Sequence, residues 1–174
     1  MVAIKPISNN PVIGMMDKVF KNSKPFYCQK LSDSFYRGSQ PDAQQIENLA
    51  QNGIKTILNL RTVSANELET LGKIAEENGL KYINIPLNPF RIKKSFPFIL
   101  DTINSASKEN PLFIHCTYGK DRTGFVSALV NYMKNGMSMK DAVKDMTAHG
   151  STNPIFLNLK RFLYEFDRKS KNFH

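Results

Sequence analysis

The segment HCTYGKDRTG, residues 115–124, carries the strongest structural signal in this chain of 174 residues. The apolar run PLFI at 111–114 is typical of a buried strand, and the run FVSALV at 125–130 is typical of a buried helix. A strand, a glycine-containing loop and a helix N-terminus in this order direct backbone N–H groups at an anion. The segment therefore predicts a phosphate-binding loop within an α/β fold.

Two residues of this loop predict chemistry. Backbone amides, a helix N-terminus and a nearby arginine all stabilise a thiolate, so Cys116 is expected to be a nucleophile that attacks phosphorus and forms a phosphocysteine. The planar guanidinium of Arg122 can bind two phosphate oxygens at once. The alternatives are a buried core cysteine and a surface arginine. A cation at a helix N-terminus, however, requires a compensating anion.

The other loop residues are expected to bind the substrate: Thr117, Tyr118, Gly119, Lys120, Thr123 and Gly124. Thr123 is expected to donate a hydrogen bond to the Cys116 sulfur, unless it is an ordinary threonine of the helix terminus. Lys120 either contacts a second phosphate or assists any phosphate electrostatically. Tyr118 either stacks on a substrate ring or forms a wall. The two glycines allow a tight backbone path close to the ligand.

Composition limits the class of protein. With 41% hydrophobic and 22% charged residues, the chain suits one globular domain. Its formal net charge of +9 favours anionic partners such as phosphoproteins, phosphoinositides or inositol polyphosphates. The Lys and Arg residues are scattered and no nucleic-acid motif is present, so nucleic acid is not an expected partner.

Two cysteines, Cys28 and Cys116, are too few for a disulfide framework. This predicts a reducing, cytoplasmic location, although a leader removed before this sequence begins would leave no trace in it. No apolar run is long enough to span a membrane. Cys28 could also trap Cys116 in a redox disulfide, but the sequence gives no geometry for such a pair.

Strands and helices alternate along the chain, and this predicts a single-domain three-layer α/β/α fold with a mostly parallel sheet of about four to five strands. Residues 1–30 are expected to be an N-terminal arm and residues 31–174 the domain. The expected strands are 34–37, 54–60, 82–85 and 111–115. The expected helix N-caps are Ser39, Ser64, Ser95 and Ser138, and a last helix carries Ile155, Leu159, Phe162, Leu163 and Phe166 on one face. Ligands of such sheets bind beyond the carboxyl ends of the strands, where Cys116 would lie.

Residues 115–124 match the signature of the protein tyrosine phosphatase superfamily: His-Cys, five residues, Arg, Thr or Ser, and Gly. The segments YRGSQP at 36–41 and GIKTILNLR at 53–61 resemble the opening of the compact atypical dual-specificity phosphatases of the bacterial and the plant-and-fungal type. The resemblance covers residues 34–166. It implies a tyrosine-phosphatase-like fold and a phosphomonoesterase without metal or cofactor, with 31–174 as its catalytic domain. It places Arg37 and Arg61 near the rim of the active site, or in salt bridges that hold the loop.

The general acid of this family is usually found after the third strand, where this chain has Asn88. An asparagine cannot donate a proton usefully to a leaving oxygen. Asp101 is the next carboxylate, but it lies on an expected helix. Asp121 is the alternative, because a carboxylate beside a dianionic phosphate is pushed toward its protonated form. Its loop form, Gly-Lys-Asp-Arg, resembles a group of bacterial phosphatases in which this aspartate is a proposed acid, so Asp121 is the predicted acid against an orienting or structural role.

Three functions remain open at this point. The first is hydrolysis of phosphotyrosine, with phosphoserine or phosphothreonine, in proteins. The second is hydrolysis of phosphoinositides or inositol phosphates, which Lys120, the cations Arg91, Lys93 and Lys94, and the net charge favour. That cluster of cations could also contact an acidic membrane surface or be a solvated loop. The third is an inactive phosphate-binding module. We expect a monomer.

Overall fold

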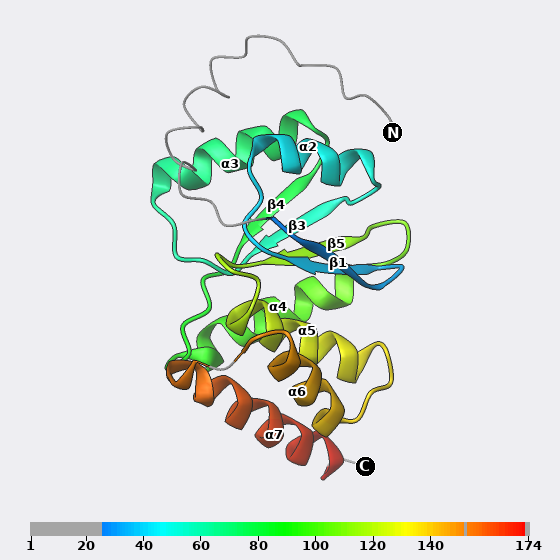
Figure 1. Cartoon of the computed structure of the whole chain (residues 1–174), viewed down its shortest axis with the longest axis vertical. Coiled ribbons are helices and arrows are strands. Elements are labelled where there is room, and N and C mark those ends of the chain that lie inside the picture. Colours follow the sequence, from blue (N-terminus) through cyan, green and yellow to red (C-terminus); the bar gives the residue numbers. More distant parts are fainter. Residues whose placement is uncertain (1–25, 152, 173–174) are drawn as a thin grey trace.

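The computed structural model of the protein describes residues 26–151 and 153–172, and in these ranges the chain forms one five-stranded sheet (Figure 1). The strands are β1 (Cys28–Ser32), β2 (Phe35–Gly38), β3 (Thr56–Asn59), β4 (Lys81–Asn84) and β5 (Leu112–His115), in the order β1-β2-β5-β3-β4. Only the β1–β2 pair is antiparallel among them. The mostly parallel sheet is therefore confirmed, and its central strand, β5, ends directly before Cys116.

Helices cover both faces of the sheet (Figure 1). One face carries α2 (Ala43–Gln51) and α3 (Ala65–Glu77). The other carries α4 (Ile92–Ser105), α5 (Asp121–Met133), α6 (Met139–Ala148) and α7 (Leu157–Lys171), with the short 3-10 helix η1 (Pro154–Phe156) before α7. Side chains of β5 alternate between the two apolar layers: Phe113 packs with α2 and α3, and Ile114 packs on the opposite side. The three-layer α/β/α architecture is confirmed.

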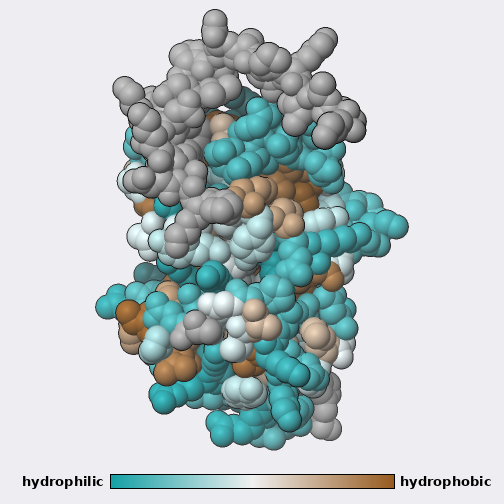
Figure 2. Space-filling view, viewed as in Figure 1, coloured by the Kyte–Doolittle hydropathy of each residue, from teal (hydrophilic) through white to brown (hydrophobic). Residues whose placement is uncertain are grey.

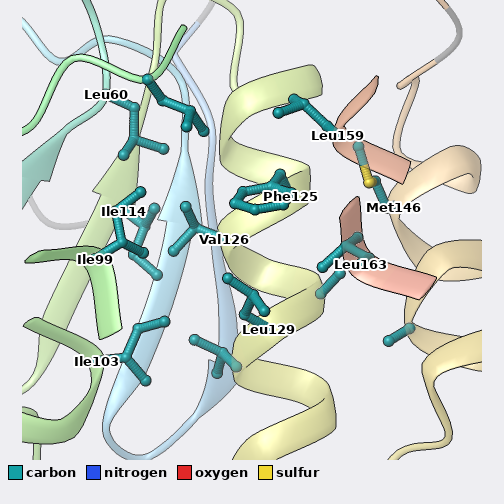
Figure 3. Packing of buried hydrophobic residues seen from close by; sticks show 14 of the residues in the cluster. Leu60, Ile99, Ile103, Ile114, Phe125, Val126, Leu129, Met146, Leu159 and Leu163 are labelled. Atoms are coloured by element: carbon teal, nitrogen blue, oxygen red, sulfur yellow. The ribbon is translucent and has the colours of Figure 1, made fainter. Parts of the chain in front are cut away.

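Helix α5, which follows the phosphate loop, is buried on all sides over most of its length, since residues 123–131 are all buried. Figure 3 shows Val126 pointing from this helix toward the sheet, while Leu159 and Leu163 approach it from α7. Burial of large apolar side chains such as these stabilises a fold by about 1.5–3 kcal/mol each. The start of α5 is thus held firmly in the core.

Two predicted helix starts are wrong. Helix α2 is capped by Asp42, whose side chain and that of Gln45 form a reciprocal capping box, while the Ser39 hydroxyl accepts a hydrogen bond from the Tyr27 amide. Helix α4 begins before Ser95, which instead donates to the carbonyl of Pro86. In both places the serine hydroxyl forms a hydrogen bond with a neighbouring segment and does not cap the helix.

Ser64 and Ser138 are confirmed as N-caps of α3 and α6. Ile155 was predicted on the apolar face of the last helix, but it lies in η1, before α7, and is 56% exposed.

Strand β1 extends into the segment predicted as an arm. It is an edge strand whose first three residues are exposed, so no apolar alternation reveals it in the sequence. Residues 1–25 of the predicted arm lie outside the described residues, and the boundary at residue 31 stays a prediction. No helix within 26–151 or 153–172 combines the length and the apolar character needed to cross a membrane.

Candidate active site

The loop from Cys116 to Lys120 joins the central strand β5 to the N-terminus of α5, and Cys116 at its base is 4% exposed. Two loop carbonyls bond outward: that of Thr117 accepts from the Gln40 amide, and that of Gly119 accepts from the Tyr27 hydroxyl. In the described part of the chain, the amides of Thr117, Gly119, Lys120 and Arg122 have no acceptor. The loop therefore ties its carbonyls to the surrounding protein and keeps donors for an anion.

Tyr27 approaches this loop through the space left by two glycines. Gly119 has a φ of +68°, and a Cβ added there would lie 2.3 Å from the Tyr27 hydroxyl oxygen and 2.6 Å from the Gly38 carbonyl oxygen. At Gly38, an added Cβ would lie 2.2 Å from the Tyr27 carbonyl oxygen. The amide of Ser39 donates to that same carbonyl. Tyr27 thus braces the loop from the side of β2.

The Tyr27 hydroxyl is a stable donor. Burial raises the pKa of Tyr27, Arg37 opposes the rise, and the charge of Cys116 adds to it. The hydroxyl therefore keeps its proton and can donate to Gly119. The sequence missed Tyr27 because it lies in the segment predicted as an arm, where no periodic pattern points to a role.

Arg122 is held between two segments. Its Nη1 lies 3.3 Å from the Leu60 carbonyl oxygen, and its guanidinium lies 6.0 Å from the centroid of the Phe156 ring. Leu60 follows β3, and its amide donates to the His115 carbonyl at 2.9 Å, so the end of β3 is fixed to the end of β5. Neither the Leu60 carbonyl nor Phe156 carries a sequence signal for this role, because one is backbone and the other resembles an ordinary apolar residue.

Arg37 and Arg61 both form salt bridges, and that of Arg61 is linked to the loop through Gln40. Arg37 is 1% exposed and makes two hydrogen bonds to Asp145, with its Nη1 2.7 Å from Oδ2, so it ties β2 to α6. Arg61 pairs with Glu67 and donates to the Gln40 side chain at 2.9 Å. Since Gln40 also bonds the loop, Arg61 acts on the loop through Gln40.

Of the positions considered for the general acid, Asp121 is the first residue of α5, directly after the phosphate loop. Its Oδ1 accepts a hydrogen bond of 3.0 Å from the hydroxyl of Ser151, which is 2% exposed. The carbonyl of Ser151 in turn accepts from Lys160 at 2.8 Å. Ser151 was not singled out in the sequence, because it lies some thirty residues beyond the loop in a segment without a motif.

The other two positions lie elsewhere. Asp101 is exposed on α4 and lines a groove of about 860 Å³ together with Asn88, and Cys116 does not line this groove. The Asn88 side chain accepts from the Phe90 amide at 2.8 Å and so shapes the turn before α4. The role of Asp121 as the acid stays a prediction.

The hydrogen bond predicted from Thr123 to the Cys116 sulfur is not formed. Thr123 is fully buried, and its hydroxyl has no hydrogen-bond partner among residues 26–151 and 153–172. His115 is also fully buried, and its Nδ1 lies 3.4 Å from the Cys116 carbonyl oxygen. Because a carbonyl only accepts, this contact requires a proton on Nδ1. Burial lowers the pKa of His115 to about 3, so the ring is neutral and acts as a support of the loop.

The remaining loop side chains face outward. Tyr118 is 50% exposed, and Lys120 is exposed, with its aliphatic stem against Gly150. Gly124 packs closely on Met146 of α6, since an added Cβ would lie 2.9 Å from its Cγ. Cys28 is exposed at the start of β1 and is not bonded to Cys116. Among the described residues, no three His, Cys, Asp or Glu side chains gather into a metal site.

Comparison with known proteins identifies this arrangement. A family model described as PTP-NADK, "DSP-PTPase phosphatase fused to NAD+ Kinase", matches residues 8–160. Among curated proteins, the dual specificity protein phosphatase TpbA of Pseudomonas aeruginosa is 23% identical over 122 residues, which cover 70% of this chain and 53% of TpbA. Human dual specificity protein phosphatase 6 is 26% identical over 151 residues, covering 84% of this chain and 38% of that protein. The chain thus spans about half the length, or less, of these relatives.

Solved structures show the same fold. The crystal structure of P. aeruginosa TpbA has a TM-score of 0.62 at 18% identity and covers 81% of this chain and 91% of that one. A structure of TpbA in complex with pTyr has a TM-score of 0.55 at 17% identity, covering 79% and 90%. The tyrosine-phosphatase-like fold expected from residues 115–124 is confirmed.

Proposed function

Because the chain belongs to the family of DSP-PTPase phosphatases, we propose that it hydrolyses phosphate monoesters through a phosphocysteine formed on Cys116. The observation that supports this proposal is the segment between β5 and α5, where a buried cysteine, backbone amides without an acceptor among the described residues, and an arginine follow one another within residues 116–122. Amides at a helix N-terminus bind phosphate oxygens and stabilise the charge that develops during transfer.

The reaction proceeds in two steps. The Cys116 thiolate attacks phosphorus, an S–P bond forms, and the ester O–P bond breaks as its electron pair leaves with the oxygen. Asp121 supplies the proton to that oxygen. Water then attacks the phosphocysteine, Asp121 takes a proton from the water, and the S–P bond breaks to return the thiolate. Arg122 binds two phosphoryl oxygens in both steps.

The first substrate class is phosphotyrosine, with phosphoserine or phosphothreonine, in proteins. The relatives named dual specificity protein phosphatases support it, as does the solved complex of TpbA with pTyr. In this proposal Tyr118, which is half exposed at the loop, contacts a ring of the substrate. We further propose that the enzyme acts as a monomer in a reducing compartment and needs no metal or cofactor.

Phosphoinositides and inositol phosphates are the second substrate class, and Lys120 is the observation that favours it. Its ammonium is exposed beside the phosphate loop and has no ion-pair partner in the described part of the chain. A free cation at this position can bind a second phosphate group. The net charge of +9 would attract such polyanions, and also an acidic membrane surface that presents them.

A phosphate-release assay in EDTA tests the proposal. The chain and its Cys116→Ser variant are compared on p-nitrophenyl phosphate, on a phosphotyrosine peptide and on a panel of phosphoinositides and inositol phosphates. Release that survives EDTA and disappears in the variant is expected, and the better substrate decides between the two classes. Phosphate binding without any release would instead identify a binding module.

A further inference from the structure

A groove of about 690 Å³ lies between the segment that leads into α4 and one face of α7. The side chains that matter here are Phe90, Arg91, Lys93 and Lys94 from the first wall, and Arg161 and Glu165 from the second. Phe90 is 70% exposed, although it is a large aromatic side chain. An exposed aromatic ring beside a groove is a common feature of protein-binding surfaces.

The charges around this groove are strongly unbalanced. Four cations face one carboxylate, that of Glu165. Among the residues that the structure describes, none of the four cations takes part in an ion pair or a side-chain hydrogen bond. By contrast, Lys73 and Lys171 are paired with carboxylates on their own helices. The groove is therefore complementary to an acidic ligand.

Arg122 does not line the groove, but it is linked to the segments that lead into both walls. Its guanidinium and the amide of Leu87 bond the same carbonyl, that of Leu60, and the chain continues from Leu87 into the first wall. On the other side, the ring of Phe156 lies against Arg122, and α7, which carries Arg161, starts at the next residue. Figure 1 shows the start of α4 beside η1 and the start of α7. The groove therefore lies between two segments that are each linked to Arg122, the residue expected to bind the substrate phosphate.

A peptide fits this surface better than a bilayer does. A groove can hold an extended peptide of a few residues, which spans about 3.3 Å per residue. A flat membrane surface would contact only the residues at the rim of the groove. Glu165 within the groove would repel an anionic bilayer, but a peptide can place a neutral or basic side chain opposite it. In Figure 2, apolar surface lies next to hydrophilic surface at this end of the molecule, as a peptide with mixed side chains requires.

We propose that this groove docks an acidic peptide segment that flanks the phosphorylated residue of a protein substrate. The inference rests on the proposed phosphatase function and names the substrate class that the same site takes. The Phe90 ring holds an apolar side chain of the segment, and Arg91, Lys94 and Arg161 bind its carboxylates. Selectivity for the protein sequence then comes from the groove, while the loop supplies the chemistry.

The test reverses three charges, in the variant Arg91→Glu/Lys94→Glu/Arg161→Glu. Its substrates are a phosphotyrosine peptide with Asp and Glu flanks, the same peptide with Asn and Gln flanks, and p-nitrophenyl phosphate. We expect KM for the acidic peptide to rise by about tenfold or more, because three exposed ion pairs are lost and repulsions replace them. The kcat for that peptide and the turnover of p-nitrophenyl phosphate should stay unchanged.

The matched control is Lys55→Glu/Lys81→Glu/Lys140→Glu, which makes the same change in net charge at exposed lysines that do not line the groove. This control should leave the preference for the acidic peptide intact. The preference of the unmodified chain for the acidic peptide should also weaken in about 1 M salt, where the Debye length falls to about 3 Å. Equal effects of the two variants, or no preference for acidic flanks, would overturn the proposal.

Two further measurements separate this proposal from others. Polarisation of a labelled acidic phosphopeptide on Cys116→Ser protein reports docking even if no substrate is turned over, so failure of the phosphatase function and failure of the groove give different results. Co-sedimentation with phosphatidylserine vesicles tests the membrane. Binding to vesicles that the groove variant loses, with an unchanged KM for peptides, would assign the surface to a bilayer and reject the peptide.

Discussion

Replacing Gly119 by alanine tests how the phosphate loop is held. An alanine at a φ of +68° is strained by about 1–2 kcal/mol. Its Cβ would also lie 2.3 Å from the Tyr27 hydroxyl oxygen, so the hydrogen bond from Tyr27 would be lost, which adds about 0.5–1.5 kcal/mol. We therefore expect the free energy of unfolding to fall by about 1.5–3.5 kcal/mol.

Activity should fall further than stability suggests. The Tyr27 side chain can rotate away, but the Gly38 carbonyl oxygen, 2.6 Å from the same Cβ, belongs to strand β2 and cannot. The loop must then shift, and a displacement of about 1 Å can reduce catalysis by about 10²-fold. Removing the Tyr27 hydroxyl as well should not restore activity, because the contact with Gly38 remains.

Gly53 provides the matched control for this experiment. It also has a positive φ, of +87°, but a Cβ added there would meet nothing within 4 Å. Gly53→Ala should be destabilised only by the backbone strain that alanine introduces, and it should keep its kcat for p-nitrophenyl phosphate. Urea unfolding and steady-state kinetics of the two variants decide the matter. If Gly119→Ala behaved like Gly53→Ala in both measurements, the loop would not be held in the way described.

Four further outcomes are expected. Tyr27→Phe, which keeps the ring, should lower kcat/KM for p-nitrophenyl phosphate by several-fold without unfolding the chain at assay temperature, as thermal melting will show. Asp121→Asn should slow an alkyl phosphate far more than an aryl phosphate with a good leaving group; equal slowing of both would assign Asp121 a positioning role. Asp145→Asn leaves the buried Arg37 without its carboxylate, so the free energy of unfolding, measured in urea, should fall by about 3 kcal/mol. Removing an exposed ion pair, by contrast, should have no measurable effect on stability. Burial lowers the pKa of His115 from 6.5 to about 3, so between about pH 6.5 and 3 only the unfolded chain takes up this proton. The free energy of unfolding should therefore fall as the pH drops through this range, by at most about 1.4 kcal/mol per pH unit. His115→Asn should reduce that slope in urea titrations at several pH values, and an unchanged slope would contradict the assignment.

The central part of the fold was predictable because its signals are local. The run at 111–114, the loop and the apolar helix after it define β5 and α5, and Ser64 and Ser138 cap their helices as their spacing with Glu67 and Asp141 predicts. The edge strand β1 has no such signal, since an edge strand with exposed residues shows no alternation. Ser39 has the residue type of an N-cap, but the nearby chain at Tyr27 uses its hydroxyl.

The supports of the site were not predictable for a related reason. Motifs reveal residues that are expected to contact a ligand, and Cys116 and Arg122 were predicted in this way. Tyr27, Ser151 and the Leu60 carbonyl act on the loop from distant parts of the sequence, and they can be found only when the fold brings those parts together. The loss of the expected bond from Thr123 shows the same limit, since side-chain direction at a helix start depends on the packing around it.

The contacts around the loop suggest how specificity and chemistry are divided in this molecule. The carbonyls of Thr117 and Gly119 are bonded by Gln40 and Tyr27, and Asp121 is bonded by Ser151, so the loop is fixed before any substrate arrives. Under the proposed function, such a preorganised loop would bind any phosphate monoester that reaches it, because it would recognise only the phosphate. Discrimination between substrates must then come from surfaces outside the loop. The groove between the start of α4 and α7 is a described surface with unpaired cations, and the segments that lead into its walls are linked to Arg122. Reversing the charges of the groove should therefore change KM for peptides and leave the chemistry of the loop intact.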